Sequence, residues 1–435
     1  MKQHVEQAFT GPLVGLKVIE IGSIGPGPFC AMLLADLGAD VVRVDRAAGA
    51  ELVGPNADFR KELLHRGRRS LAVDLKHPDG PEVVLSLVEA ADVLIEGFRP
   101  GVAERLGIGP DACAARNPEL IYGRMTGFGQ DGPLAQHVGH DINYLALSGA
   151  LSMIGRYGQP PTPPLSLVGD FGGGGMVLAL GIVAALFERQ RSGLGQVIDA
   201  SMVEGAALLA TAFFGFAQSG VWNRQRGTNV VDSGAPYYDV YETADGKWLS
   251  VGAIEARFYA DLVSLLGLPD DLPEQNDRSR WPEMKKIFAD AVRTRSRDEW
   301  LAAAEGLSCC VSPLLEVDEA PVHPHNLARS AFVEIDGVAQ PAPAPRFSRS
   351  QAFVDRRPPL PGEHSREVLG DWGIRSERAI AWLKSGAVAQ HANSEEYEIG
   401  DLEGHCRESK AGDPVTLALA GSKRRSRRRR PPAGS

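Results

Sequence analysis

Residues 16–46, LKVIEIGSIGPGPFCAMLLADLGADVVRVDR, predict a strand, a Gly/Pro turn, a helix and a second strand. The two ends are short runs rich in β-branched residues, and the middle has an amphipathic pattern that ends at Gly38. A strand–helix–strand unit of this length indicates two parallel strands joined by a crossover helix. The glycines at 22, 25 and 27 follow GxxGxG spacing rather than GxGxxG, so a nicotinamide-dinucleotide site is poorly supported.

The same alternation continues along the chain. A helix is expected near 79–91, and the runs DVLIEG (92–97) and ELIYGRMTGFG (119–129) are expected strands. A different pattern starts at 236, where PYYDVYETAD and GKWLSVGAIE flank an Asp245-Gly246 turn, which is typical of a β-hairpin. We therefore predict an α/β protein with a doubly wound, Rossmann-like large domain and a smaller α+β domain.

These patterns also suggest boundaries. We expect the large domain at 1–200, linker helices at 201–235, the small domain at 236–330, and a linker with a C-terminal segment returning to the large domain at 331–390. The tail 391–435 is polar, and seven of eight residues from Lys423 to Arg430 are basic. Without apolar periodicity it is expected to be disordered. It could contact nucleic acid or another anionic surface, or it could be a solvated appendage or the product of a shifted reading frame.

Composition narrows the functional class. The 435 residues are 43% hydrophobic and 23% charged, with a formal net charge of −9 that argues against nucleic-acid binding by the body of the protein. Five cysteines without CxxC spacing suit a reducing compartment and give no zinc signature. The N-terminus lacks an apolar signal core, and the longest apolar run, MVLALGIVAALF (176–187), is about half of what a bilayer span needs. We expect a cytoplasmic protein without a membrane partner.

Asp170 stands in SLVGDFGGGG (166–175), at the end of a β-like run and before four glycines that are expected to open a long helix. Glycines there would let a ligand approach the backbone, and the free amides of a helix N-terminus could stabilise an anion. Asp170 could equally be a simple helix cap. The stretch alone leaves both interpretations open.

Two other candidates stand at expected helix starts. In GHDINYLALSG (139–149), Asp141 could cap the first turn, while His140 could be a proton-transfer group at a pocket edge. In VGAIEARFY (251–259), Glu255 could be the first-turn acid that a helix dipole favours, or a functional carboxylate. Basic side chains after expected strands, including Arg46 and Arg99, are placed to hold phosphates.

Together, several stretches resemble the family III CoA-transferase superfamily. They are 15–46, RGRRSLAVDLKHPDG (66–80), IEGFRPGVAERLG (95–107), GHDINYLALSG and LVGDFGGGGMVLALGIVAALFERQRSGLGQVIDASM (167–202), and the resemblance runs from Gly11 to Val388. It implies an interlocked homodimer in which a large CoA-binding Rossmann-like domain is joined to a small domain by linkers that wrap the partner.

Within this superfamily the chain resembles the racemases, which invert the carbon next to the thioester of 2-methylacyl-CoA, a reaction of fatty-acid metabolism. The resemblance implies His140 and Asp170 as the catalytic pair, with Glu255 of either subunit partnering the histidine. It implies an acyl-CoA substrate, no metal, and no cofactor beyond the CoA of that substrate. The implied CoA contacts are Arg46, Val73, Asp74, Leu75, Lys76, Gly97, Phe98, Arg99, Arg105, Gly139, Asp141, Ile142, Asn143 and Tyr144.

The chemistry suits these residue types. Inversion needs a group that removes a proton from one face and another that returns one to the opposite face, through an enolate. A histidine, whose ordinary pKa is about 6.5, can serve either role, whereas Asp170 would need its pKa raised by desolvation. Glu255 would orient the imidazole, and the amides of residues 170–174 would hold the enolate oxygen.

Two alternatives remain. A family III CoA-transferase would use Asp170 as a nucleophile, but such enzymes generally lack the histidine at position 140 and often carry a Gly-rich lid that 236–330 does not contain. A non-catalytic CoA-binding protein with the basic tail as its working part would not need His140, Asp170 and Glu255 together.

Overall fold

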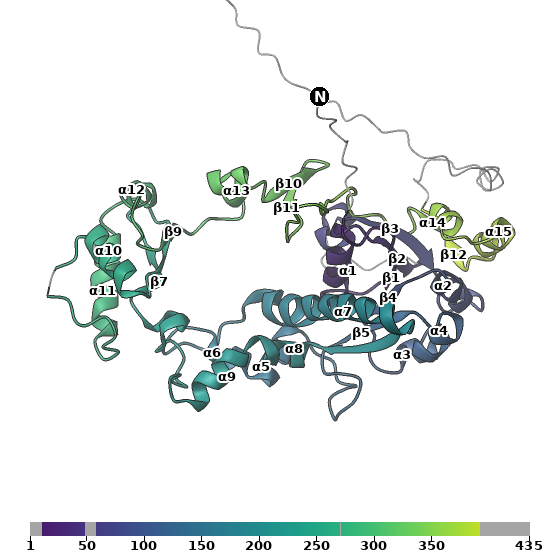
Figure 1. The fold of residues 1–435 in the computed structure, drawn as a ribbon, viewed down its shortest axis with the longest axis horizontal. Coiled ribbons are helices and arrows are strands. Elements are labelled where there is room, and N and C mark those ends of the chain that lie inside the picture. The colour runs from purple at the N-terminus through teal and green to yellow at the C-terminus, as the bar shows by residue number, and fades with distance from the viewer. Residues whose placement is uncertain (1–10, 48–57, 270, 392–435) are drawn as a thin grey trace, which may run out of the picture. The chain divides into compact units, whose positions relative to one another are not determined.

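The computed structural model describes residues 11–47, 58–269 and 271–391 (Figure 1). Apart from its first residue, the tail predicted at 391–435 lies outside these ranges. The strands of the large domain are β1 (Lys17–Ile21), β2 (Asp40–Arg46), β3 (Arg68–Val73), β4 (Val93–Glu96), β5 (Ile121–Thr126), β6 (Gln196–Ser201) and β12 (Val388–Ala389).

Within the described residues, the large sheet has seven strands in the order β12-β3-β2-β1-β4-β5-β6. All neighbours are parallel except β12, which pairs antiparallel with β3. The order 3-2-1-4-5-6 is that of a doubly wound Rossmann-like sheet, so the predicted fold of the large domain is confirmed. The order reverses between β1 and β4, and this is where such sheets bind ligands.

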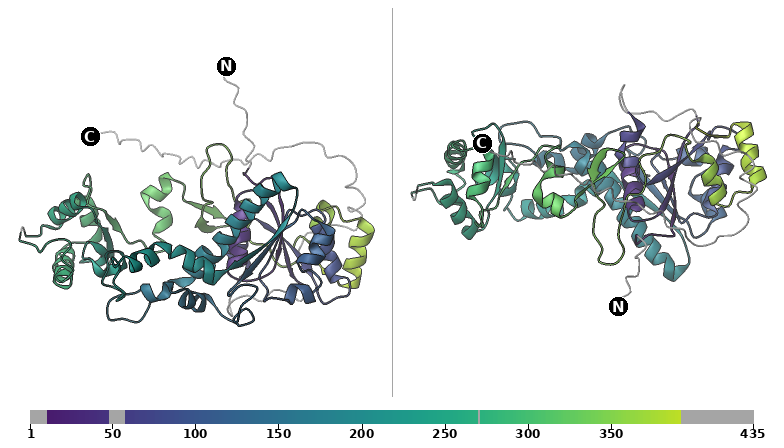
Figure 2. Two further views of the ribbon diagram at one scale, coloured as in Figure 1. Left: turned by 60° about the horizontal axis from the view of Figure 1, so that its bottom comes forward. Right: turned by 90° about the horizontal axis from the view of Figure 1, so that it is seen from above.

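Helices cover both faces of this sheet (Figure 2). The α-helices are α1 (Pro26–Asp36), α2 (Gly80–Val88), α3 (Val102–Arg105), α4 (Pro110–Arg116), α5 (Asp141–Ser148), α6 (Ala150–Met153), α7 (Val177–Ser192), α8 (Met202–Leu209), α9 (Thr211–Gln218), α14 (Ser365–Asp371) and α15 (Ser376–Ser385). Shorter 3₁₀ turns are η1 (Phe59–Lys61), η2 (Leu63–His65) and η3 (Leu165–Leu167), and π-helical segments are η4 (Val168–Met176) and η5 (Val230–Gly234).

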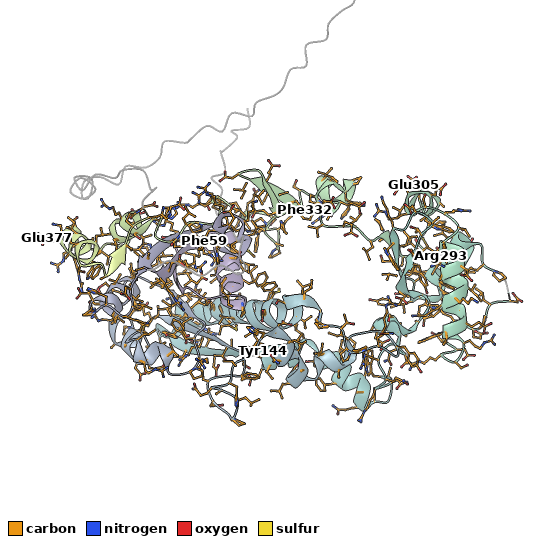
Figure 3. All side chains as sticks on the ribbon, turned by 180° about the vertical axis from the view of Figure 1, so that it is seen from behind. Phe59, Tyr144, Arg293, Glu305, Phe332 and Glu377 are labelled. Carbon is orange, nitrogen blue, oxygen red and sulfur yellow. The ribbon has the colours of Figure 1, made fainter. Side chains whose placement is uncertain are left out.

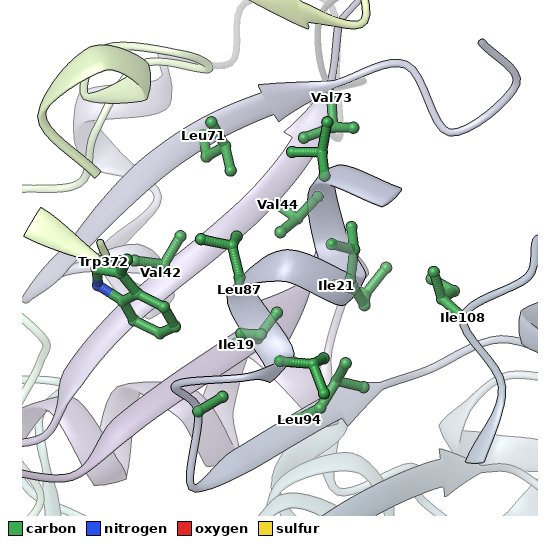
Figure 4. Packing of buried hydrophobic residues seen from close by; sticks show 14 of the residues in the cluster. Ile19, Ile21, Val42, Val44, Leu71, Val73, Leu87, Leu94, Ile108 and Trp372 are labelled. Carbon is green, nitrogen blue, oxygen red and sulfur yellow. The ribbon is translucent and has the colours of Figure 1, made fainter. Parts of the chain in front are cut away.

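The alternation of side chains along each strand divides the core into two layers. Ile19, Val42 and Leu94 point to one face, where they pack with Leu87 of α2 and with Trp372 (Figure 4). The intervening residues of the strands point to the other face, where α1 and α7 cover them. Strands such as β1 and β4 are buried on both faces and are mostly apolar, which explains why short apolar runs predicted them.

The small domain contains β7 (Tyr238–Glu242), β8 (Trp248–Gly252), β9 (Val311–Pro313), α10 (Ala256–Leu266), α11 (Trp281–Val292) and α12 (Arg297–Ala303). Its strands form an antiparallel sheet, and the predicted hairpin turns at Gly246 with a φ of +73°. Trp281, Phe288 and Trp300 are buried in its core, and Figure 3 labels Arg293 and Glu305 on this domain. The predicted α+β unit is therefore present.

The remaining elements are η6 (Ala320–Val322), α13 (Pro324–Ala328), β10 (Phe332–Ile335) and β11 (Val338–Pro341). β10 and β11 form a hairpin, after which the chain runs back along the large sheet. The carbonyl of Arg356 accepts the N–H of Gly67, and Val388 pairs with Val73. The C-terminal part of the described chain thus supplies the outermost strand of the large sheet.

One helical segment differs from expectation. Residues 165–176, predicted as a strand end and a helix start, continue directly into α7. Among the described residues, only Leu165–Ser192 forms a helix long and apolar enough, by length and composition, to cross a membrane, with 39% of its most apolar window buried. The helix is longer than the apolar run 176–187 because the glycines and the residues before them extend it.

Candidate functional site

A cavity of about 520 Å³ opens at the point where the strand order reverses. The loops that leave β1, β4 and β5 diverge there and expose a crevice at the carboxyl ends of the strands. Its lining is formed by Ser23, Ile24, Gly25, Pro26, Gly27, Gly97, Phe98, Arg99, Pro100, Met125, Thr126, Gly127, Phe128, Ala135, His137, Val138, Gly139, His140, Tyr144, Asp170 and Met202. Two predicted catalytic residues, His140 and Asp170, are therefore in one cavity.

His140 is the residue that precedes α5, and its side chain is exposed to the cavity. Its backbone N–H donates to Asn143 Oδ1 at 3.0 Å. The loop before it is anchored by Tyr144, labelled in Figure 3, whose hydroxyl donates to the carbonyl of Gly139. The Tyr144 ring also packs edge-on against Phe128, with 5.1 Å between ring centroids. These contacts fix the backbone of residues 139–144, which carries His140 at the cavity wall.

Asp170 is half-buried in the π-helical segment η4. Burial raises the pKa of its carboxyl above the usual value, a hydrogen bond from the Ser166 hydroxyl lowers it, the charge of Asp141 raises it, and His140 lowers it. The net rise favours the protonated form of Asp170. A carboxyl group in this state is suited to donating a proton as well as accepting one.

The four glycines after Asp170 have a packing role that the sequence did not reveal. A Cβ on Gly173 would lie 2.6 Å from the backbone nitrogen of Ala206, and one on Gly175 would lie 2.7 Å from the carbonyl oxygen of Pro26. The run therefore lets η4 pack backbone to backbone between α1 and α8. The prediction that the glycines open a helix is wrong, because Asp170 itself lies inside the helical segment.

The same geometry corrects two further expectations. The N–H of Asp170, expected to hold an anion, instead donates to Asp141 Oδ1 at 2.7 Å. Asp141, expected to cap α5, is the first residue of that helix, and its buried carboxylate reaches η4. His140 takes the position before the helix.

The residues predicted to contact CoA gather along the carboxyl edge of the sheet. Arg46 and Val73 are register partners at the ends of β2 and β3, and residues 74–76 follow directly. Gly97, Phe98 and Arg99 line the cavity, as do Gly139 and Tyr144. Arg105 is exposed on α3, and Ile142 and Asn143 are exposed on the first turn of α5, outside the cavity lining.

Glu255 is the predicted catalytic residue that the chain does not bring to this cavity. It is exposed immediately before α10 in the small domain and is absent from the lining that contains His140. Across the described residues, no group of three or more His, Cys, Asp or Glu side chains could hold a metal ion.

Sequence reasoning missed other residues around the site. The loop 23–27 after β1 lines the cavity, and its GxxGxG spacing was the available signal. Ser166 was missed because its bond to Asp170 depends on both lying in one helix. A second, larger cavity of about 920 Å³, lined mainly by apolar residues of α6, α8, α9, β7 and β8, had no sequence signal.

Comparison with known proteins agrees with this arrangement. A family model described as CoA-transferase family III matches residues 13–365. The chain is 49% identical over 382 residues to alpha-methylacyl-CoA racemase of Mus musculus and 47% identical over 381 residues to that of Homo sapiens. Each match covers 87% of this chain and 97% of the relative.

A solved structure supports the same relationship. The crystal structure of a CAIB/BAIF family protein from Brucella suis matches with a TM-score of 0.73 and 26% sequence identity, covering 83% of this chain and all of the other. The sheet order, the cavity at its reversal point and the sequence matches all lead to one assignment. The chain belongs to CoA-transferase family III.

Proposed function

We propose that this protein racemises the α-carbon of 2-methylacyl-CoA thioesters. The observation that carries the proposal is the placement of His140 and Asp170 in one cavity at the reversal point of the sheet. The identity of almost one half to two curated alpha-methylacyl-CoA racemases, over nearly their whole length, supports the same reaction.

His140 and Asp170 are the proposed acid/base pair. One removes the proton next to the thioester carbonyl, which leaves an enolate, and the other returns a proton to the opposite face. The roles exchange when the opposite enantiomer reacts, so each group must be able to act as a base and as an acid. The raised pKa of Asp170 supports this double role, because a carboxyl group with the usual pKa would be a poor donor at neutral pH.

The enolate oxygen needs hydrogen-bond donors. The N–H of Asp170 donates to Asp141 and that of Asn143 donates to the carbonyl of His140, so we assign this role to the N–H groups of Asp141 and Ile142 at the start of α5, beside His140. The first N–H groups of a helix have no intrahelical acceptor and carry a partial positive charge.

The CoA part of the substrate would lie along the carboxyl edge of the sheet. Arg46, Lys76 and Arg99 are exposed there and offer positive charges for its phosphates. Gly97 has no side chain, so the substrate can pass close to the protein backbone. Arg105 and the turn 139–144 extend the same surface. We propose no other cofactor, because the thioester carbonyl itself stabilises the carbanion as an enolate.

We also propose that the protein is a homodimer. Leu180 and Phe187 of α7 are 70% and 64% exposed, and Leu208, Phe214 and Phe216 continue apolar exposure over α8 and α9. A surface of this kind is typical of a subunit interface. A second copy would cover it and would bring the partner subunit's Glu255 to His140, where a carboxylate would orient the imidazole.

Proton exchange tests the reaction. A single enantiomer of a 2-methylacyl-CoA is incubated with the protein in deuterium oxide without any free carboxylic acid, and NMR follows the α-proton. We expect deuterium to enter the α-position as the enantiomer is lost, and His140→Ala and Asp170→Ala each to slow this by about 10²–10⁴-fold while CoA still binds. Exchange that required an added acid, or CoA moving between acids, would establish a transferase instead.

A mixed dimer tests where Glu255 acts. Co-expressed His140→Ala and Glu255→Gln subunits, carrying different affinity tags, are purified as the heterodimer. If Glu255 acts across the interface, one of the two sites has both native groups, and about half of the wild-type activity returns. If Glu255 acts within its own subunit, both sites remain defective.

A further inference from the structure

Asp141 links the two proposed catalytic residues, one by a peptide bond and the other by a hydrogen bond. It follows His140 directly in sequence, and its carboxylate accepts the N–H of Asp170 across 29 residues. We propose that Asp141 is a positioning residue that sets the separation of His140 and Asp170 across the substrate. The inference rests on the proposed racemase function and assigns to Asp141 a task other than binding CoA.

The contact is short and partly buried. Asp141 Oδ1 lies 2.7 Å from the backbone nitrogen of Asp170, and the Asp141 residue is 8% exposed. A charged acceptor makes a stronger hydrogen bond than a neutral one, and burial protects this bond from competition by water. One residue is therefore covalently joined to the first proposed acid/base group and hydrogen-bonded to the backbone of the second.

Gly169 makes the approach possible. A Cβ on Gly169 would lie 2.3 Å from Asp141 Oδ1 and 2.9 Å from its carboxyl carbon. Any side chain at this position would push the carboxylate out of the bond. The glycine before Asp170 thus serves the tether, whereas the glycines after Asp170 serve the packing of η4 against α1 and α8.

The segment that carries Asp170 has a particular need for such a tether. Glycine is a poor helix former, and η4 contains five of them among nine residues. A π-helical segment is also an uncommon backbone form that occurs mostly at functional sites. The bond from Asp141 ties this segment to the start of α5, which is itself held by Tyr144 and Asn143.

The tether also carries a charge, and this provides a kinetic signature. The titratable groups that face Asp170 are His140, Asp141 and Tyr144 from α5, with the Ser166 hydroxyl from its own helix. Asp141 raises the pKa of Asp170, so replacing it by a neutral acceptor should lower that pKa. The Asp170 limb of the kcat/KM profile should then move to lower pH in both reaction directions.

Three substitutions test the inference. Asp141→Ala removes the acceptor, Asp141→Asn keeps an acceptor oxygen without the charge, and Gly169→Ala displaces the carboxylate from the opposite side. Ser296→Ala is the matched control, because Ser296 accepts a backbone N–H at the start of α12 in the small domain. Each variant is assayed for kcat and KM in both directions, for its pH profile, and for hydrogen exchange of the peptide 165–176.

We expect Asp141→Ala and Gly169→Ala to lower kcat by about 100-fold, as a displacement near 1 Å does in a preorganised site, with little change in KM. Both substitutions should speed the hydrogen exchange of the backbone amides in 165–176. Asp141→Asn should retain most of kcat and most of the protection of 165–176 from hydrogen exchange, but its kcat/KM profile should show the Asp170 limb at lower pH. Ser296→Ala should leave kcat, the pH profile and the hydrogen exchange of 165–176 unchanged. The proposal is overturned if Asp141→Ala keeps kcat within about threefold of wild type, or if Asp141→Asn loses as much as Asp141→Ala.

The readouts separate this inference from the proposed function. If the wild-type protein did not exchange the substrate α-proton, the proposed racemase function would be refuted. If Asp141→Ala left the hydrogen exchange of 165–176 unchanged, the proposed tether between Asp141 and Asp170 would be refuted.

Discussion

Gly173→Ala should damage both stability and activity, although the change adds a single methyl group. Gly173 lies three residues after Asp170, where η4 meets α8. The added Cβ would be 2.6 Å from the backbone nitrogen of Ala206 and 2.9 Å from the carbonyl carbon of Gly205. Ordinary van der Waals contact begins at 3.4 Å, so the two helices must separate by roughly 1 Å. The contacting atoms are backbone, so no side chain can rotate away.

The expected cost follows from this geometry. Overpacking of a well-filled interior costs about 1–3 kcal/mol, and the gain in helix propensity from Gly to Ala offsets at most about 1 kcal/mol. A displacement of η4 by roughly 1 Å would carry Asp170 with it, and a shift of that size costs about 100-fold in turnover. We therefore expect a net destabilisation of about 1–2 kcal/mol with a much larger relative loss of activity.

Urea unfolding and α-proton exchange of the same preparations measure the two effects. Gly181→Ala is the matched control, because it adds the same methyl to α7 but meets only the side chain of Ile198, at 3.3 Å and 3.7 Å. It should keep wild-type activity. If Gly173→Ala were as stable and as active as Gly181→Ala, the account of the glycine run as a backbone packing device would be refuted.

Three further predictions concern other parts of the structure. Arg68→Met should lower the free energy of unfolding by about 3–5 kcal/mol in chemical denaturation, because it leaves the fully buried Glu20 without its ion-pair partner; an unchanged midpoint would contradict this. Ser296→Ala should cost about 1 kcal/mol through the lost cap of α12, detectable as an earlier unfolding of the small domain, and a larger loss would point to a role beyond capping. Burial, followed by nearby arginines, lowers the pKa of His65 to about 2. The unfolded chain therefore binds a proton more readily below pH 6.5, and His65 should cost the native protein up to about 1.4 kcal/mol per pH unit as pH falls from 6.5 towards 2. His65→Gln should flatten that decline relative to an exposed control, His325→Gln, and parallel curves for the two would refute the assignment.

Much of the architecture could be predicted from the sequence because it depends on local pattern. Short runs such as 17–21 and 93–96 are buried on both faces of the sheet, so their β-branched, apolar composition alone marked them as strands. The Asp245-Gly246 turn predicted its hairpin because only a few residues adopt the required backbone conformation. The same local signals, together with the family resemblance, selected His140 and Asp170, and the structure places both in one cavity.

The surroundings of those two residues depended on contacts that no local pattern contains. The run SLVGD favoured a strand end before a helix, but the residues lie inside a helix because η4 gains backbone packing against α1 and α8 that outweighs its poor propensity. The bond from Asp141 to Asp170 joins residues 29 apart, so it could not be distinguished in the sequence from an ordinary helix cap. The sequence alone thus determined the β1–α1–β2 unit, the later strands β4 and β5, the hairpin of the small domain and the residue types available for chemistry. The tertiary structure decided how the two acid/base candidates are held. Their positions depend on how closely η4 packs against α1, α5 and α8, and at these contacts only glycine leaves enough room.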